Sequence, residues 1–327
     1  MSAPIPALLP VALFLVSLAA GSFPAPARAG AVPVPSARTM AVTVDDLPAV
    51  PFSDLGTMRS LTERLLRALR AHDVEAVAFV NEGKLVPAAE RDARLALLRA
   101  WVDAGHDLGN HTFSHVDLQR TPLGQYEADV VRGEVAIREV LAARGRRPRW
   151  FRHPYTHTGP TAEVRRAFET FLASRGYLVA PFSVENTDYV FDVARRDSLR
   201  RGDGKTAARL VSAYVEHTMA AVAYGEALAR DTFGRDVPQI LLVHANGTNA
   251  EALSTVLERL RDRGYRFVTL DEALGDEAWR TPDGYVGPKG LSWLHRFRVA
   301  RGLPLRPETE PDPPRWVLHR YRAARVR

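Results

Sequence analysis

The sequence predicts an α/β fold in which parallel strands alternate with helices. The first observation behind this prediction is that short apolar runs alternate with amphipathic stretches from Thr39 onward. The second is the composition, because 327 residues with 46% hydrophobic and 25% charged side chains are typical of a globular protein with a sizeable core. Such alternation favours a parallel sheet, open or closed as a barrel, whose ligands bind at the carboxyl ends of the strands.

Seven runs have the character of strands, and six longer stretches have apolar residues at helical spacing. Asn249 is the predicted N-cap of the last of these helices, and Gly264 is its predicted end. The segment 195–205 is predicted to be a solvated loop. The predicted strands are 40–44, 76–80, 107–110, 149–151, 177–184, 240–244 and 267–270, and the predicted helices are 60–71, 88–104, 126–143, 161–174, 206–229 and 250–263.

Composition and missing motifs exclude several kinds of site. With no cysteine, the chain has no thiolate zinc site, iron–sulfur cluster or cysteine nucleophile, so a metal must be held by His, Asp or Glu. The G-x-S-x-G, H-E-x-x-H and G-x-x-x-x-G-K-[ST] signatures are absent as well. The net charge of +6 arises in residues 280–327, where 11 basic side chains face 4 acidic ones. A nearly neutral main domain argues against a nucleic-acid partner.

The N-terminus has the pattern of a secretory signal peptide. Ala7–Ala20 is an apolar run of 14 residues, and Ala27–Ala29 is a small-x-small cleavage site. The predicted organisation is a signal peptide over 1–29 and a short linker over 30–38, followed by an exported domain, periplasmic or secreted, with no membrane span after cleavage. An uncleaved anchor is the alternative.

Titratable residues follow four of the predicted strands. Asp45 and Asp46 end the first strand, where adjacent carboxylates need a cation or protons to offset their repulsion. His111 and His115 follow the third strand at a spacing that can share a metal. His244 ends the most apolar strand, in a position suited to proton transfer. Taken singly, each of these features also fits solvated or structural side chains.

Arg152 follows the fourth strand. A fixed guanidinium beside a strand-end carboxylate would hold that carboxylate ionised and oriented. A surface arginine before a proline turn is the alternative interpretation. His106 is predicted to be structural, and His153 and His157 are predicted to lie at the surface or behind the site.

Five motifs, which contain these residues and follow one another along the chain, resemble those of the polysaccharide deacetylases with a NodB-homology domain (carbohydrate esterase family 4). The resemblance covers about 39–274, and it implies a distorted, incomplete (β/α) barrel. The motifs that carry it are Thr43–Leu47 (TVDDL), His111–His115 (HTFSH), Arg152–Tyr155 (RHPY), Glu185–Tyr189 (ENTDY) and Leu241–His244 (LLVH).

The resemblance implies that Asp46, His111 and His115 bind one divalent metal ion, with zinc as the expected metal. It implies a hydrolase that removes N-acetyl groups from an amino-sugar polymer or oligosaccharide of the cell envelope.

Four further roles follow from the resemblance. Asp45 would be the general base, and Arg152 would hold it ionised. His244, oriented by Asp188, would be the acid that protonates the departing amine. The backbone N–H near Tyr155 would stabilise the oxyanion.

The sequence departs from the family's pattern at three positions. Leu47 replaces a glycine, Tyr189 replaces a tryptophan in the groove wall, and Glu185 replaces an aspartate. These changes concern specificity, so a small-molecule amide hydrolase on the same scaffold remains an alternative. A catalytically silent carbohydrate-binding protein is a further alternative. It would be expected to lack at least one of the motif residues, and none is lost: the five are Asp45, Asp46, His111, His115 and His244.

The basic C-terminal extension, 275–327, has two interpretations. It either packs its tryptophans onto the barrel with its arginines in solvent, which the glycine turns favour, or it docks on anionic envelope polymers or a membrane surface.

Overall fold

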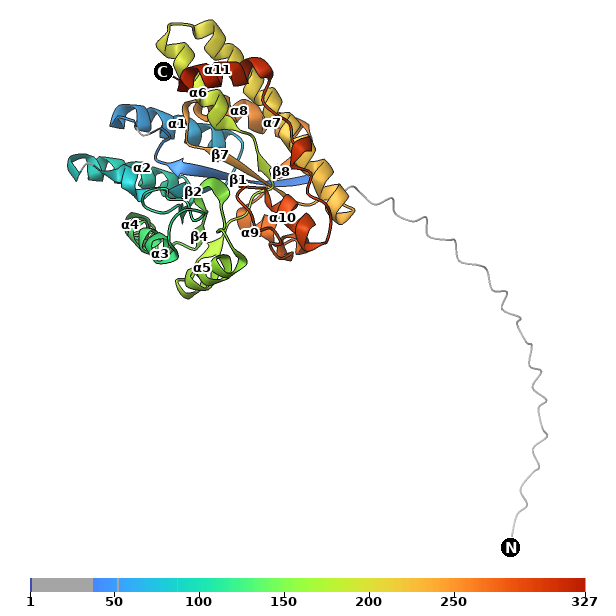
Figure 1. The fold of residues 1–327 in the computed structure, drawn as a ribbon. Coiled ribbons are helices and arrows are strands. Elements are labelled where there is room, and N and C mark those ends of the chain that lie inside the picture. Colours follow the sequence, from blue (N-terminus) through green and yellow to red (C-terminus); the bar gives the residue numbers. More distant parts are fainter. Residues whose placement is uncertain (2–37, 52, 87, 327) are drawn as a thin grey trace. The chain divides into compact units, whose positions relative to one another are not determined.

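A parallel sheet runs through the centre of the structure, a computed structural model that describes Met1 and residues 38–326 except positions 52 and 87 (Figure 1). The strand order is β5-β4-β3-β2-β1-β7-β6, and β8 also pairs with β1. Every pairing is parallel, so the carboxyl ends of the strands meet at one edge. The strands are β1 (Arg38–Leu47), β2 (Val77–Val80), β3 (Asp107–Asn110), β4 (Trp150–Phe151), β5 (Leu178–Val179), β6 (Val184–Glu185), β7 (Gln239–His244) and β8 (Tyr265–Phe267).

The sheet is curled into an incomplete barrel. β5 and β6 stand at opposite ends of the strand order, yet only residues 180–183 separate them in the chain. That link spans at most about 18 Å, whereas seven strands laid flat would be about 29 Å wide. The two ends must therefore approach each other, and the predicted (β/α) architecture is confirmed.

Helices surround the sheet, as the predicted alternation requires (Figure 1). Three-residue and four-residue 3-10 turns supplement them at η1 (Glu82–Leu85), η2 (Ala88–Glu90), η3 (Pro154–Thr156), η4 (Glu277–Arg280) and η5 (Pro307–Thr309). The helices are α1 (Leu55–Ala71), α2 (Arg91–Asp103), α3 (Leu123–Arg132), α4 (Val135–Ala142), α5 (Ala162–Ser174), α6 (Asp188–Arg200), α7 (Gly204–Phe233), α8 (Gly247–Asp262), α9 (Leu270–Leu274), α10 (Trp293–Ala300) and α11 (Arg315–Arg325).

Two predicted elements are each divided in the structure. The run 177–184 forms β5 and β6 rather than one strand, because Pro181 between them lacks the N–H that a continuous ladder needs. The stretch 126–143 forms α3 and α4, which are interrupted at Gly133 and Glu134.

The prediction of a loop over 195–205 is wrong except at 201–203, because α7 begins at Gly204 and α6 extends to Arg200. Apolar side chains of this helix are buried, and the Arg196–Asp192 ion pair spans one turn at 2.7 Å. The predicted cap of α8 is also displaced. Asn246 is the N-cap and accepts from the Asn249 amide at 2.9 Å, while Gly264 follows the helix end at φ +90° as expected.

The C-terminal residues that the structure describes pack onto the rest of the fold. Trp293 of α10 contacts Phe182 with ring centroids 5.5 Å apart. Val317 of α11 is fully buried in the main core, and Trp316 packs beside it under the Arg209 guanidinium. The domain boundary at 274 remains a prediction, and the predicted signal peptide and most of the linker lie outside the described residues. No helix in the described part of the chain is long and apolar enough to cross a membrane.

Candidate metal centre and active-site cavity

The end of β1 presents two carboxylates to one cavity. Asp45 pairs in register with His244 of β7 and is 2% exposed. Asp46 has a φ of +74° and lies at an irregularity within β1, where the register with β2 shifts between Val44 and Leu47. Both side chains therefore line the cavity, although neighbours in a regular strand would point to opposite faces.

The loop after β3 carries His111 and His115, which lie on no helix. Thr112 and His115 have left-handed backbone angles, with φ of +63° and +55°. The Asn110 side chain accepts from the Thr112 amide at 2.8 Å and donates to the Val130 carbonyl of α3 at 2.9 Å. The loop is thus tied to α3.

Two glycines allow this loop its close packing. A Cβ at Gly133 would meet the Phe113 nitrogen and the Thr112 carbonyl carbon at 2.6 Å. A Cβ at Gly83, on the other side, would meet the Phe113 oxygen at 2.6 Å. The backbone between the two histidines is therefore held between η1 and the end of α3, and this contact explains why the predicted helix 126–143 is interrupted.

Asp46, His111 and His115 form a cluster whose ligand atoms all lie within 4.8 Å of one another. The His111 Nδ1 lies 2.8 Å from the Arg152 carbonyl oxygen. Since a carbonyl only accepts, Nδ1 carries the proton and Nε2 keeps its lone pair for a metal. Burial lowers the pKa of both histidines, so both are neutral, as ligation requires. Two imidazoles and one carboxylate fit a divalent ion with open positions.

Lys84, which the sequence analysis did not single out, contacts this cluster. Its Nζ donates to the backbone oxygen and to Oδ1 of Asp46, each at 3.0 Å. Burial would raise the pKa of Asp46, but Lys84 and then His115 outweigh it and hold that pKa well below its usual range. No recognisable motif surrounds Lys84, and only the folded chain brings it to Asp46.

Glu82 anchors the turn that carries Lys84. Its Oε1 accepts from the Ile137 amide of α4 at 2.9 Å, and burial raises its pKa to about 7. Between pH 4.5 and 7 the folded chain therefore binds more protons at Glu82 than the unfolded chain, and stability falls as the pH rises through this window.

We expect Glu82→Gln to remove the part of the pH dependence of stability that comes from Glu82. Between pH 4 and pH 8 the wild type should lose roughly 3 kcal/mol of unfolding free energy relative to Glu82→Gln, which has no carboxyl group to ionise at this position. Urea unfolding across this range measures it, with the exposed Glu258→Gln as control. Parallel stability profiles for wild type and Glu82→Gln would contradict the assignment.

Asp45 is held by a buried guanidinium. The Arg152 Nη1 lies 3.7 Å from the Asp45 Oδ2, and Nη2 donates to the Thr43 hydroxyl at 2.9 Å. Burial raises the pKa of Asp45 to about 6, and Arg152 limits the rise. Among the described residues the buried Asp45 Oδ1 has no hydrogen-bond partner, and the residue lines the cavity.

His244 is oriented by a fully buried carboxylate. Its Nδ1 lies 2.8 Å from the Asp188 Oδ1, and the Asp188 Oδ2 accepts from the His244 amide and from Asn249. The Nδ1 therefore carries a proton toward Asp188, which leaves Nε2 for the cavity. Burial would lower the pKa of His244, but Asp188 outweighs it and raises the pKa to about 10. The ring is thus a cation at neutral pH.

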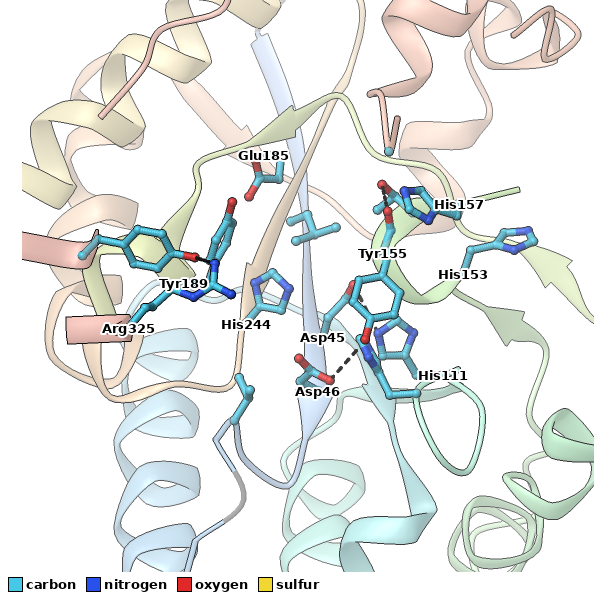
Figure 2. A pocket seen from close by; sticks show the side chains of 16 residues that line it. Asp45, Asp46, His111, His153, Tyr155, His157, Glu185, Tyr189, His244 and Arg325 are labelled. Atoms are coloured by element: carbon cyan, nitrogen blue, oxygen red, sulfur yellow. Dashed lines mark hydrogen bonds and ion pairs between the residues drawn. The ribbon is translucent and has the colours of Figure 1, made fainter. Parts of the chain in front are cut away.

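The cavity that these groups line has a volume of about 580 Å³. Figure 2 shows Tyr155 and His157 on one side of it and Tyr189 on the other, with His244 and Asp45 between them. Seven of the nine predicted site residues line the cavity, and the other two, Arg152 and Asp188, contact Asp45 and His244 from behind. The seven are Asp45, Asp46, His111, His115, Tyr155, Tyr189 and His244.

The three other histidines that the sequence analysis singled out have different surroundings. His106 is buried and its Nδ1 accepts from the Ala76 amide at 3.2 Å, a structural contact. His153 is 1% exposed beside Phe168, so it does not lie at the surface. The His157 Nδ1 pairs with Asp117 at 2.9 Å at the edge of the cavity. Tyr321 and Arg325 of α11 complete the wall, and sequence reasoning did not identify them.

Comparisons with known proteins agree with this architecture. Residues 33–169 match the family described as polysaccharide deacetylase. The peptidoglycan-N-acetylglucosamine deacetylase PgdA of Listeria monocytogenes is 24% identical over 248 residues, covering 75% of this chain and 41% of that protein. A chitin deacetylase of Pestalotiopsis sp. is 29% identical over 185 residues, or 57% of each chain. This chain thus spans less than half the length of the Listeria protein.

Solved structures show the same fold. A carbohydrate esterase family 4 pseudoenzyme from Bacillus anthracis aligns with a TM-score of 0.51 and 17% identity, covering 74% of this chain and 67% of that one. A mutant of a pseudoenzyme from this family, with restored enzymatic activity, aligns with a TM-score of 0.50 and 20% identity, covering 74% and 69%. At these identities the likeness concerns the fold.

Proposed function

We propose that this chain, whose residues 33–169 match the polysaccharide deacetylase family, is a hydrolase that removes N-acetyl groups from an amino-sugar polymer or oligosaccharide. The observation that carries the proposal is one cavity lined by a three-ligand cluster, by a carboxylate that a buried guanidinium holds and by a histidine that a buried carboxylate orients. The names of the similar proteins, which act on peptidoglycan and chitin, support a glycan substrate.

The chain's own residues supply the proton transfers. Asp45, which lines the cavity, takes a proton from the attacking water, and Arg152 holds that carboxyl in place. The water oxygen forms a bond to the acetyl carbon, and the backbone N–H of Tyr155 stabilises the oxyanion. His244 gives its Nε2 proton to the amide nitrogen as the carbon–nitrogen bond breaks, and the products are acetate and a free amine.

The cluster of Asp46, His111 and His115 would hold the divalent ion, with zinc proposed as the metal. When bound, such an ion supplies Lewis-acid polarisation of the acetyl oxygen and makes the attacking water more acidic. Asp188 fixes the orientation of the proton-donating histidine, with one oxygen on the ring Nδ1 and the other on the His244 amide. Tyr189, half exposed in the cavity wall, is proposed to contact the sugar.

We further propose that the protein is exported to the periplasm or secreted. The apolar run and cleavage pattern of residues 1–29 support this proposal, as do the cell-wall substrates in the names of several similar proteins.

Acetate release from N-acetylglucosamine oligomers tests the proposed function. The chelated protein is expected to be inactive and to recover activity with one equivalent of zinc per chain. Cobalt, nickel and manganese added to the same apoprotein compare the candidate metals. Stoichiometric metal binding with no acetate from any glycan would refute the glycan deacetylase assignment.

A further inference from the structure

The C-terminal helix α11 forms part of the active-site cavity. It packs along α6, and its fully buried Val317 belongs to the main core. The Tyr321 ring meets the Tyr189 ring edge-on, with centroids 6.1 Å apart. Tyr321 and Arg325 line the same cavity as the metal-ligand cluster (Figure 2). The basic extension therefore reaches the reaction site itself.

The Arg325 side chain is held by Tyr321 but has no ion-pair partner among the described residues. Its Nη1 donates to the Tyr321 hydroxyl at 3.1 Å, and the guanidinium carbon lies 5.6 Å from that ring's centroid. Within the described part of the chain, no carboxylate lies within ion-pairing distance of Arg325. A guanidinium has five N–H donors in a planar fork that matches a carboxylate, and one hydrogen bond leaves most of them unused.

The position of Arg325 in the cavity suits contact with a sugar unit next to the one that is deacetylated. It lies beside Tyr189 and His244 in Figure 2, across the cavity from Tyr155. For a sugar whose acetamide lies between Asp45 and His244, the Tyr189 side is one of the two walls that a neighbouring unit can meet. A neutral acetamide sugar has no group that needs a cation there, whereas an acidic unit does.

We propose that Tyr321 and Arg325 form a subsite for the carboxylate of an acidic saccharide unit next to the one that is deacetylated. The inference rests on the proposed function and narrows its substrate class to amino-sugar chains that carry carboxylates. The carboxylate can belong to a lactyl ether or to a uronic acid, which present the same charge to the guanidinium.

Steady-state acetate release by Arg325→Gln tests the subsite on matched oligosaccharides. One series alternates N-acetylglucosamine with units that carry a lactyl-ether carboxylate, a second carries uronates, and a third has the same carboxylates methyl-esterified. We expect KM to rise about tenfold on whichever acidic series is recognised, with kcat unchanged, and no change on the esters. Arg322→Gln is the matched control, because Arg322 is exposed in the same last turn and does not line the cavity.

The outcomes separate the subsite from the proposed function. If acetate is released and Arg325→Gln changes KM equally on the acidic and the esterified series, the subsite is overturned. It is also overturned if KM changes on neither acidic series. In both cases the proposed deacetylase function is unaffected. Absence of release from every series would overturn the proposed function. Calorimetric binding of the same oligosaccharides to the metal-free protein then decides the subsite, since Arg325→Gln must weaken binding of an acidic series only.

Discussion

Replacing Asp45 with asparagine is expected to lower kcat for acetate release by about 10²–10⁴-fold, the usual contribution of a positioned general base. Asparagine has the same shape but takes no proton, so the attacking water keeps its own. The three ligand side chains are unchanged, and metal stoichiometry should stay at one ion per chain. Measurement of kcat beside metal content separates the two effects.

The surface variant Asp103→Asn is the control for the loss of one carboxylate. Thermal unfolding must accompany the assay, because Arg152 remains buried without its partner in Asp45→Asn and the fold is destabilised. A folded, metal-loaded Asp45→Asn whose kcat stays within tenfold of wild type would remove Asp45 from the role of base.

Replacing His115 with alanine is expected to abolish stoichiometric metal binding and to lower activity by about 10³-fold or more, since the ion's charge stabilisation is worth several kcal/mol. His115 supplies one of only three ligand atoms in the cluster, and its Nε2 lies 3.6 Å from the Asp46 Oδ1. Metal analysis after dialysis measures the first effect, and acetate release measures the second.

His319→Ala is the matched control, because this histidine of α11 is exposed and does not line the cavity. It should keep both the ion and the activity. A His115→Ala protein that retains one tightly bound ion per chain would show that the cluster of Asp46, His111 and His115 is not the metal site.

Much of the fold follows from patterns that act over a few residues. Alternating apolar runs predict the strands, and the confirmed parallel sheet explains why residues far apart in sequence meet at one edge. Asp45 and His244 were expected at strand ends, and the β1–β7 register places them side by side.

Other features depend on packing between distant segments. The interruption at Gly133 reflects the close approach of the loop at Phe113, which helical spacing does not reveal. Lys84 reaches Asp46 from a turn that distant segments fasten, through Glu82 to α4 and through Gly83 to Phe113. The docking of α11 brings Arg325 to the cavity from the far end of the described chain, and no local pattern specifies where a helix docks.

The glycines on either side of Phe113 also limit how this protein can change over evolutionary time. Neither glycine lines the cavity, and alanine is the smallest possible replacement for each. Yet one added methyl group would displace the backbone that joins His111 to His115. Mutational drift is therefore restricted at these two positions by the spacing of the proposed metal ligands, and a library aimed at new substrates should leave both unvaried.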